Sequence, residues 1–284
     1  MYRTSYLSFL VIAVCLLLPT VAQAAEPKAD PVTFLGLPVT TSIVTAWVFS
    51  ILLIILIRVA GGRPTMIPSR GQAVLEAIIV GLRDIIRPIV GEKVIKPVFP
   101  LLIGLFLFIL FHNWSGLMPG VGSIGMKNEE GVMVLKFLRP GNTDLSLPLA
   151  IAIVTFVAWL YFCIRYAGIK ALVYDIFGNK ADKKTTAKAI YISLIPIFLF
   201  VGVIEIISIA FRPVALSLRL YGNMFGGENL LLEMTNFVAF IVPIPFYFFE
   251  IMVGVIQAAI FTMLVAIYIG LVCNHPEGEG EHGH

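Results

Sequence analysis

Two long stretches of this chain, residues 97–126 and 145–164, contain no Asp, Glu, Lys or Arg, and Glu250 is the only such residue between Glu233 and Glu277. An uncharged apolar run of about 18 residues or more can cross the hydrocarbon core of a bilayer as a helix. Charged residues make up only 13% of the chain, about half the share in soluble domains. The sequence therefore predicts an all-α polytopic membrane protein.

The N-terminus has the layout of a secretory signal peptide. Arg3 precedes an apolar core that ends at Pro19, and the small-residue sequence A-Q-A follows. This order predicts that residues 1–24 are removed, with an uncleaved first span as the alternative. Residues 25–284 are expected to form a single membrane domain, whose Gly- and Glu-rich end, 274–284, is predicted to be disordered.

The apolar segments predict about five membrane helices and one amphipathic surface helix. The surface helix is expected at about 70–92, where apolar residues recur at helical spacing and charged residues such as Arg83 and Asp84 take the other faces. The spans are expected at about 41–58, 97–114, 145–164, 189–233 and 236–273.

The last two segments are too long for simple spans. A helix over 189–233 would measure roughly 67 Å, against a hydrocarbon core of about 30 Å. Each segment either bends through the membrane twice or lies strongly tilted. We favour two long, tilted, antiparallel helices that form a hairpin, joined near residues 234–240.

Basic residues predict the orientation of the chain. Residues 58–96 contain seven Lys or Arg and residues 165–188 contain six, whereas 115–147 contain three. Because basic loops stay in the cytoplasm, the first two segments are expected inside and the third outside. The mature N-terminus is then outside the cytoplasm and the C-terminus in the cytoplasm.

Polar residues interrupt the two long segments. They are Glu205, Arg212, Arg219, Asn223, Glu228, Glu233, Glu250 and Gln257. Ionisable groups inside spans are costly and suggest a functional pathway. For Arg212 and Glu233, an ion pair or a place at the interface is the favoured interpretation. Arg219 lies far from both ends, and small residues on its stripe, Gly222 and Gly226, would let another helix come close.

Folding the two segments as a hairpin predicts two polar levels. Arg219 comes level with Gln257, and Glu228 level with Glu250. Glu205 lies on the cytoplasmic side of the arginine. This arrangement predicts two half-paths for protons, separated by one fixed positive charge.

Four sequences on these segments resemble those of a known family, subunit a of F-type ATP synthases. They are "SLRLYGNMFGGE", "VIQAAIFTML", "NWSGLMPG" and "PGNTDLSLPLAIA". The resemblance covers nearly the whole chain after the signal segment. It implies a proton-translocating stator subunit with no catalytic site and no cofactor of its own. The implied setting is a bacterial inner membrane, and the implied partners are a ring of c subunits, the peripheral-stalk subunit b, other ATP synthase subunits and the lipid bilayer.

The resemblance also implies roles for individual residues. Arg219 matches the family's essential arginine, and Asn223 and Gln257 match its polar companions. Glu205 matches the acid of the cytoplasmic side and Glu228 the acid of the outer half-channel. The position of Glu250 is often His or Glu in the family.

Two other functions remain as alternatives. A secondary transporter would use Arg219 to anchor an anionic substrate, but it predicts internal repeats, and none is visible in the sequence. A membrane-embedded enzyme would need a metal cluster or a nucleophile with its base. The three cysteines have no metal or redox spacing and are interpreted as small apolar residues. Neither a metal site nor a nucleic-acid partner is expected.

Overall fold

The structure, a computed structural model, describes residues 32–34, 37–39, 41–62, 67–118, 125–127, 133–136, 144–169, 188–237 and 241–273. The predicted signal peptide and the predicted C-terminal tail lie outside these residues. The helices are α2 (Thr41–Gly61), α3 (Arg70–Val90), α4 (Glu92–Ser115), α5 (Ser146–Phe162, followed by a π-helical turn, Cys163–Ala167), α7 (Lys188–Phe237) and α8 (Pro243–Cys273).

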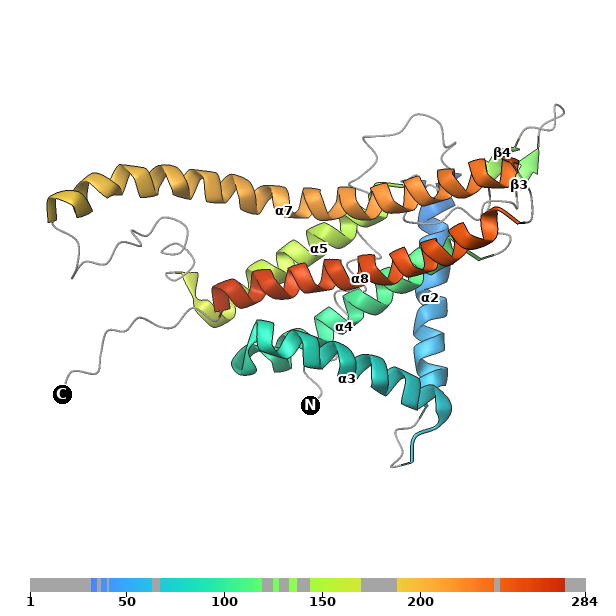
Figure 1. Ribbon diagram of the computed structural model, residues 1–284, viewed down its shortest axis with the longest axis horizontal. Helices are drawn as coiled ribbons and strands as arrows, with labels where there is room; N and C mark the ends of the chain where they lie inside the picture. The colour runs from blue at the N-terminus through green and yellow to red at the C-terminus, as the bar shows by residue number, and fades with distance from the viewer. Residues whose placement is uncertain are drawn as a thin grey trace.

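The predicted fold class is confirmed. Five of the described helices, α2, α4, α5, α7 and α8, are long and apolar enough to cross a membrane. Two short antiparallel hairpins accompany them, β1 (Val32–Phe34) with β2 (Leu37–Val39), and β3 (Gly125–Lys127) with β4 (Met133–Lys136). Figure 1 shows that the helices make up the body of the molecule.

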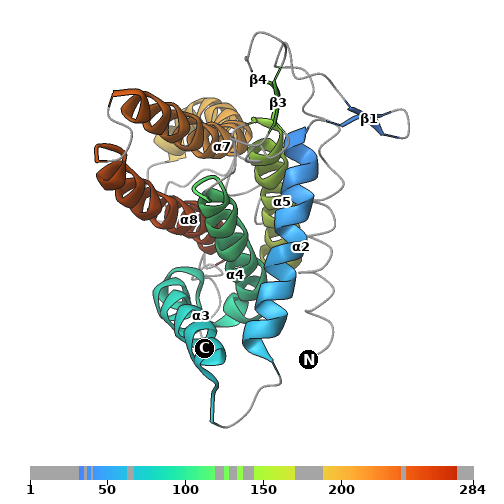
Figure 2. The same cartoon turned by 90° about the vertical axis from the view of Figure 1, so that its right-hand side faces the viewer.

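The helix α3 is the expected amphipathic helix. The Ser69 side chain caps its start by accepting a hydrogen bond from the Gln72 backbone N–H (3.3 Å). Its apolar face is buried in the C-terminal half, where Ile86 and Val90 are fully enclosed, whereas Val74 and Ile79 nearer its start are exposed, as is Arg83 on the other face. Figure 2 shows α3 at the end of α4, away from α7.

A sharp turn joins α3 to α4. Gly91 has a positive φ of +83°, a backbone conformation that residues other than glycine rarely adopt. Its N–H donates a hydrogen bond to the Arg87 carbonyl (3.0 Å). Arg87 also forms an ion pair with Glu92 across the turn. The chain therefore reverses from the amphipathic helix into a membrane helix within one residue.

The helices α3, α4, α5 and α8 pack around one apolar core. Fully buried side chains such as Leu102 and Ile109 of α4, Ile151 of α5 and Phe261 of α8 form its centre. Lipid is as apolar as these side chains, so close van der Waals contact, rather than exclusion from water, stabilises such packing. Small residues permit that contact at two places on α8.

The first place is Gly254, where a Cβ atom would come within 3.2 Å of the Trp114 ring. The second is Gly270, where a Cβ atom would collide with the backbone carbonyl of Ile89 in α3. Side chains at these positions would push α8 away from its neighbours. The end of α8 and the helix α3 therefore lie on the same side of the molecule.

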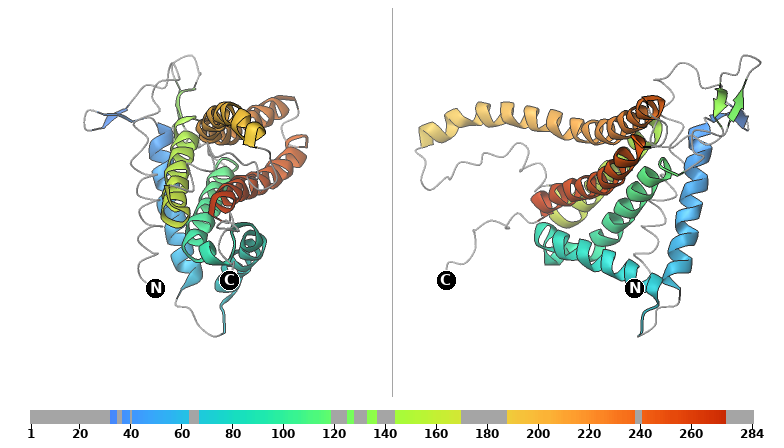
Figure 3. Two further views of the ribbon diagram at one scale, coloured as in Figure 1. Left: turned by 90° about the vertical axis from the view of Figure 1, so that its left-hand side faces the viewer. Right: turned by 45° about the vertical axis from the view of Figure 1, so that its right-hand side comes forward.

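The helices α7 and α8 form the predicted hairpin. They run side by side at a steep angle to α2, and α7 continues beyond the end of α8 (Figures 1 and 3). The 50 residues of α7 would extend about 75 Å as a straight helix. Pro196 and Pro213 lie within it without ending it. In the most apolar part of α7 only 6% of residues are buried, against 50% in α8, so α7 leaves much of its surface uncovered by this chain.

Candidate functional site

Arg219 lies on an uncovered surface of α7. Its neighbour Leu220 faces inward and is fully buried, whereas Arg219 is exposed. A Cβ atom at Gly222 or Gly226 would meet nothing within 4 Å. We call the surface that bears Arg219, Gly222 and Gly226 the open face of α7. It combines one cation with two positions where a neighbouring helix could approach closely.

Within the part of the chain that the structure describes, the Arg219 guanidinium forms no hydrogen bond or ion pair. An isolated cation in a membrane-spanning segment is costly unless something outside the segment compensates for it. The structure therefore leaves the Arg219 guanidinium exposed and uncompensated among the residues that it describes.

Asn223 and Gln257 join the two helices of the hairpin. The Asn223 side-chain amide donates a hydrogen bond to Gln257 Oε1 (2.7 Å). Gln257 is only 3% exposed. The sequence predicts that Gln257 lies level with Arg219. In the structure the partner of Gln257 is Asn223, one helical turn farther along α7 than Arg219.

Glu250 lies under the backbone of α7. Its side chain is 8% exposed, and a Cβ atom on Gly227 would collide with its carboxylate. Glu228, the next residue of α7, is half-buried. The hairpin thus brings the segment that carries Glu228 to the level of Glu250.

Two side chains of α4 hold this part of α8 in place. The Asn113 side-chain amide donates to the Gly254 carbonyl (3.2 Å), and the Trp114 indole N–H donates to the Ile251 carbonyl (3.2 Å). Both acceptors lie within one turn of Glu250. The α4 helix therefore sets the position of the Glu250 backbone.

Arg212 and Glu205 form an ion pair on α7. Arg212 donates to Glu205 Oε1 (2.9 Å), which agrees with the interpretation of Arg212 as a structural partner. The Arg212 guanidinium also lies over the ring of Tyr268 in α8, 4.5 Å from its centre. Among the described residues, Arg212 therefore has an ion-pair partner and an aromatic neighbour, whereas Arg219 has no hydrogen bond or ion pair.

The chemistry that these side chains can support is proton exchange and electrostatics. Among the described residues, no three His, Cys, Asp or Glu side chains gather where a metal ion could be held. The acids lie on two sides of Arg219 along α7, with Glu205 toward one end of the helix and Glu228 toward the other.

A comparison with protein families identifies the family of this chain. The family model described as ATP synthase A chain matches residues 39–270. This chain belongs to that family. The A chain is a proton-translocating component of the membrane sector of ATP synthase, so the protein takes part in ATP synthesis and proton transport together with other ATP synthase subunits in a lipid membrane.

The match to the A-chain family runs from the last residue of β2 to residue 270 in α8 and includes all six residues proposed from the sequence as site residues. It confirms the family that the sequence motifs indicated. The alternative interpretation as a secondary transporter receives no support from it.

Three residues around the A-chain site were not predicted from the sequence to have a role there. The sequence places Gly227 only within a family motif, whereas the structure shows that it makes room for the Glu250 carboxylate. Asn113 and Trp114 also lie within a family motif, and the structure shows that both bind the backbone of α8. A polar Asn-Trp pair at the end of an apolar run was the available signal, since buried donors in a membrane need acceptors.

Proposed function

We propose that this chain is the stator subunit that provides two proton half-channels against a rotating ring of c subunits. Arg219 is the fixed charge that separates them. The observation that carries the proposal is the exposed arginine on the open face of α7, with no anionic partner among the residues that the structure describes. The proposed partner is a carboxylate on the ring.

Electrostatics supports this role for Arg219. Arginine remains protonated at any physiological pH, so it cannot relay a proton. A carboxylate about 4 Å from it would gain roughly 4 kcal/mol at an effective dielectric constant near 20. That attraction favours the charged carboxylate and drives proton release beside Arg219. Elsewhere the carboxylate must take up a proton before it faces lipid.

The acids on either side of Arg219 then belong to the two proton half-channels. Glu228 and Glu250, with the polar pair Asn223 and Gln257, form the outer half-channel. Glu205 belongs to the cytoplasmic half-channel. Protons that enter by one route and leave by the other turn the ring in one direction. No ATP chemistry is assigned to this chain, because ATP is made or hydrolysed on other subunits.

The proposed orientation follows from the distribution of basic residues, and the proposed membrane and partners follow from the family resemblance. We propose a bacterial inner membrane, a cleaved signal peptide, a mature N-terminus outside and a cytoplasmic C-terminus, with the peripheral-stalk subunit b as a further partner. The contact of Gly270 with α3 supports this orientation, since it places the end of α8 beside the basic segment 58–96. An epitope tag after residue 284 should be accessible in inverted membrane vesicles and protected in intact spheroplasts. The opposite pattern would reverse the proposed orientation.

The central test uses the whole ATP synthase in inverted vesicles. Arg219→Ala should abolish ATP-driven acidification and ATP synthesis, while the chain still co-purifies with the complex. Arg83→Ala, which removes an exposed cation of α3, is the matched control and should pump normally. Coupled pumping by Arg219→Ala at normal assembly would reject the proposed gate.

A further inference from the structure

Arg212 and Glu205 form an ion pair that spans two turns of α7. The residues are seven apart, and the guanidinium reaches Glu205 Oε1 at 2.9 Å. Long side chains on a helix lean toward its N-terminus, so Arg212 points in the direction of Glu205. The side chains are 21% and 41% exposed, respectively. An ion pair between exposed side chains contributes little to stability by itself, so the position of Arg212 depends on its other contacts.

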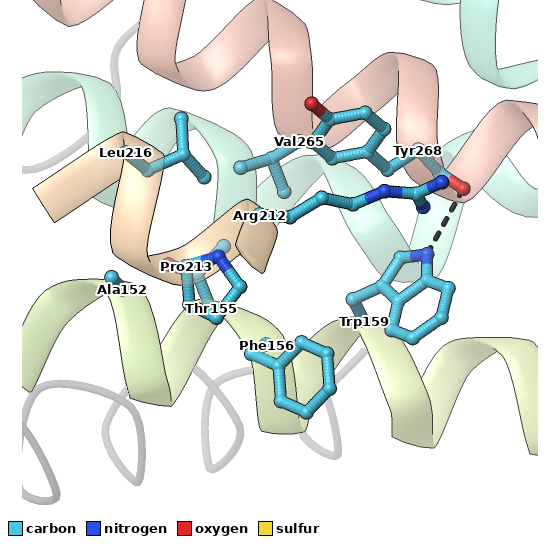
Figure 4. A pocket seen from close by; sticks show the side chains of 9 residues that line it. All are labelled: Ala152, Thr155, Phe156, Trp159, Arg212, Pro213, Leu216, Val265 and Tyr268. Atoms are coloured by element: carbon cyan, nitrogen blue, oxygen red, sulfur yellow. Dashed lines mark hydrogen bonds between the residues drawn. The ribbon is translucent and has the colours of Figure 1, made fainter. Parts of the chain in front are cut away.

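Two aromatic rings, which we call the Tyr268–Trp159 clamp, hold the Arg212 guanidinium between them. The guanidinium lies 4.5 Å from the centre of the Tyr268 ring and 5.9 Å from the Trp159 ring. Figure 4 shows Arg212 between these rings in a small pocket bounded by α5, α7 and α8. A guanidinium on an aromatic face is attracted by the ring quadrupole, and more strongly where water is excluded.

The two residues that carry these rings are also joined by a hydrogen bond. The Trp159 indole N–H donates a hydrogen bond to the Tyr268 backbone carbonyl (3.0 Å), drawn as the dashed line in Figure 4. The Trp159 ring also stacks on Phe156, with 5.6 Å between ring centres. The helices α5 and α8 therefore hold the clamp rigidly, and the clamp determines where the Arg212 guanidinium lies.

We propose that Arg212 is a positioning residue for proton transfer, which the Tyr268–Trp159 clamp holds so that its guanidinium fixes the Glu205 carboxylate in the cytoplasmic half-channel. The inference rests on the proposed role of Glu205 in that half-channel. Glu205, Arg212 and Arg219 recur every seven residues along α7 and so lie on one stripe. The positive charge of Arg212 is paired with Glu205. Arg219 is therefore the cation of this stripe that remains available to the carboxylates of the ring.

The test is a double-mutant cycle on proton flux in vesicles that contain the whole complex. Arg212→Gln should lower ATP-driven acidification about threefold to tenfold, as expected for residues coupled by direct contact. Arg212→Lys, which keeps the charge, should recover part of the loss. In a Glu205→Gln background the same Arg212→Gln change should cost almost nothing further, because the carboxylate it positions is gone.

The amount of this chain that co-purifies with the complex separates positioning from folding. An Arg212→Gln loss that is equally large with and without the Glu205 carboxylate would overturn the proposal. So would a Glu205→Gln variant with normal flux, since Arg212 would then have nothing to position. Neither result would affect Arg219, whose role is tested separately by loss of coupling in Arg219→Ala.

A second pair of variants keeps the test valid if Arg212→Gln does not assemble. Tyr268→Leu removes the ring and keeps both charges, and it should lower the flux in the presence of Glu205 but not in the Glu205→Gln background. Tyr268→Phe keeps the ring face and should retain most of the flux that Tyr268→Leu loses. Equal losses in these two variants would show that the ring face does not hold Arg212. Tyr161→Leu, at an exposed tyrosine of α5, is the control for loss of an aromatic ring.

Discussion

The backbone of Gly227 in α7 lies directly against the carboxylate of Glu250 in α8, so that no side chain fits between them. The contact joins the two helices at the level of Glu228. It also explains why an acid on α8 can be buried to 8% exposure beside a helix whose residues are largely exposed. The position of the Glu250 carboxylate depends on the absence of a Cβ atom at residue 227.

Gly227→Ala should therefore displace the Glu250 side chain and slow proton flux. A shift of about 1 Å at a reacting group can cost roughly a hundredfold in rate, and we expect a loss of about tenfold or more. The measurement is the initial rate of ATP-driven acidification at equal assembly. Gly104→Ala, at a glycine of α4 where a Cβ atom meets nothing within 4 Å, is the control. Equal rates for the two variants would contradict the importance of the contact.

Glu228 and Glu250 should behave as one functional unit. Removing either acid is expected to lower proton flux about tenfold or more, as for loss of a proton-transfer group. If the two share one half-channel, Glu228→Gln combined with Glu250→Gln should cost much less than the two single losses together. Strictly additive losses in vesicle acidification would show that the acids act independently.

An exchange of side chains between the helices should restore some activity to an inactive variant. Arg219→Gln alone should be inactive, because the ring carboxylate loses its counter-charge. Adding Gln257→Arg places a guanidinium on α8 at a position that bonds to Asn223, one turn from Arg219. Recovery should be partial, because position 257 is only 3% exposed and the new side chain must extend toward the open face.

ATP-driven quenching of a pH-sensitive dye measures the exchange, and Gln257→Arg alone is its control. A double variant as inactive as Arg219→Gln would show that the arginine must be attached to α7.

Gly270→Ala should weaken the attachment of α3 to α8. The added methyl group would collide with the backbone carbonyl of Ile89, which cannot rotate away as a side chain can. Overpacking of this kind typically costs about 1–3 kcal/mol. The expected result is a lower temperature for heat-induced loss of this chain from the detergent-solubilised complex.

Gly81→Ala on α3 is the matched control, since a Cβ atom there meets nothing within 4 Å and alanine favours the helix. An unchanged midpoint temperature for Gly270→Ala would show that the added methyl group does not weaken the contact between α8 and α3.

Much of the architecture could be predicted from the sequence because charge is so costly in a bilayer. The charge-free runs predicted the spans that became α4 and α5, and apolar spacing predicted the amphipathic helix α3. The same cost makes Arg219 stand out as a candidate site residue from its place in an apolar segment alone.

The hairpin register placed Glu228 level with Glu250, but the individual contacts between helices could not be predicted from the sequence, because lipid and protein interiors are equally apolar. Ile204 is 52% exposed and Leu220 is fully buried on the same helix, and no hydrophobic pattern separates the two. Only the packing of α7 on α8 decided that Gly227 covers Glu250 and that Asn223 bonds to Gln257. Likewise, only the meeting of α5, α7 and α8 brought Arg212 between two rings, since helix rotation and crossing depend on the shapes of all three helices at once.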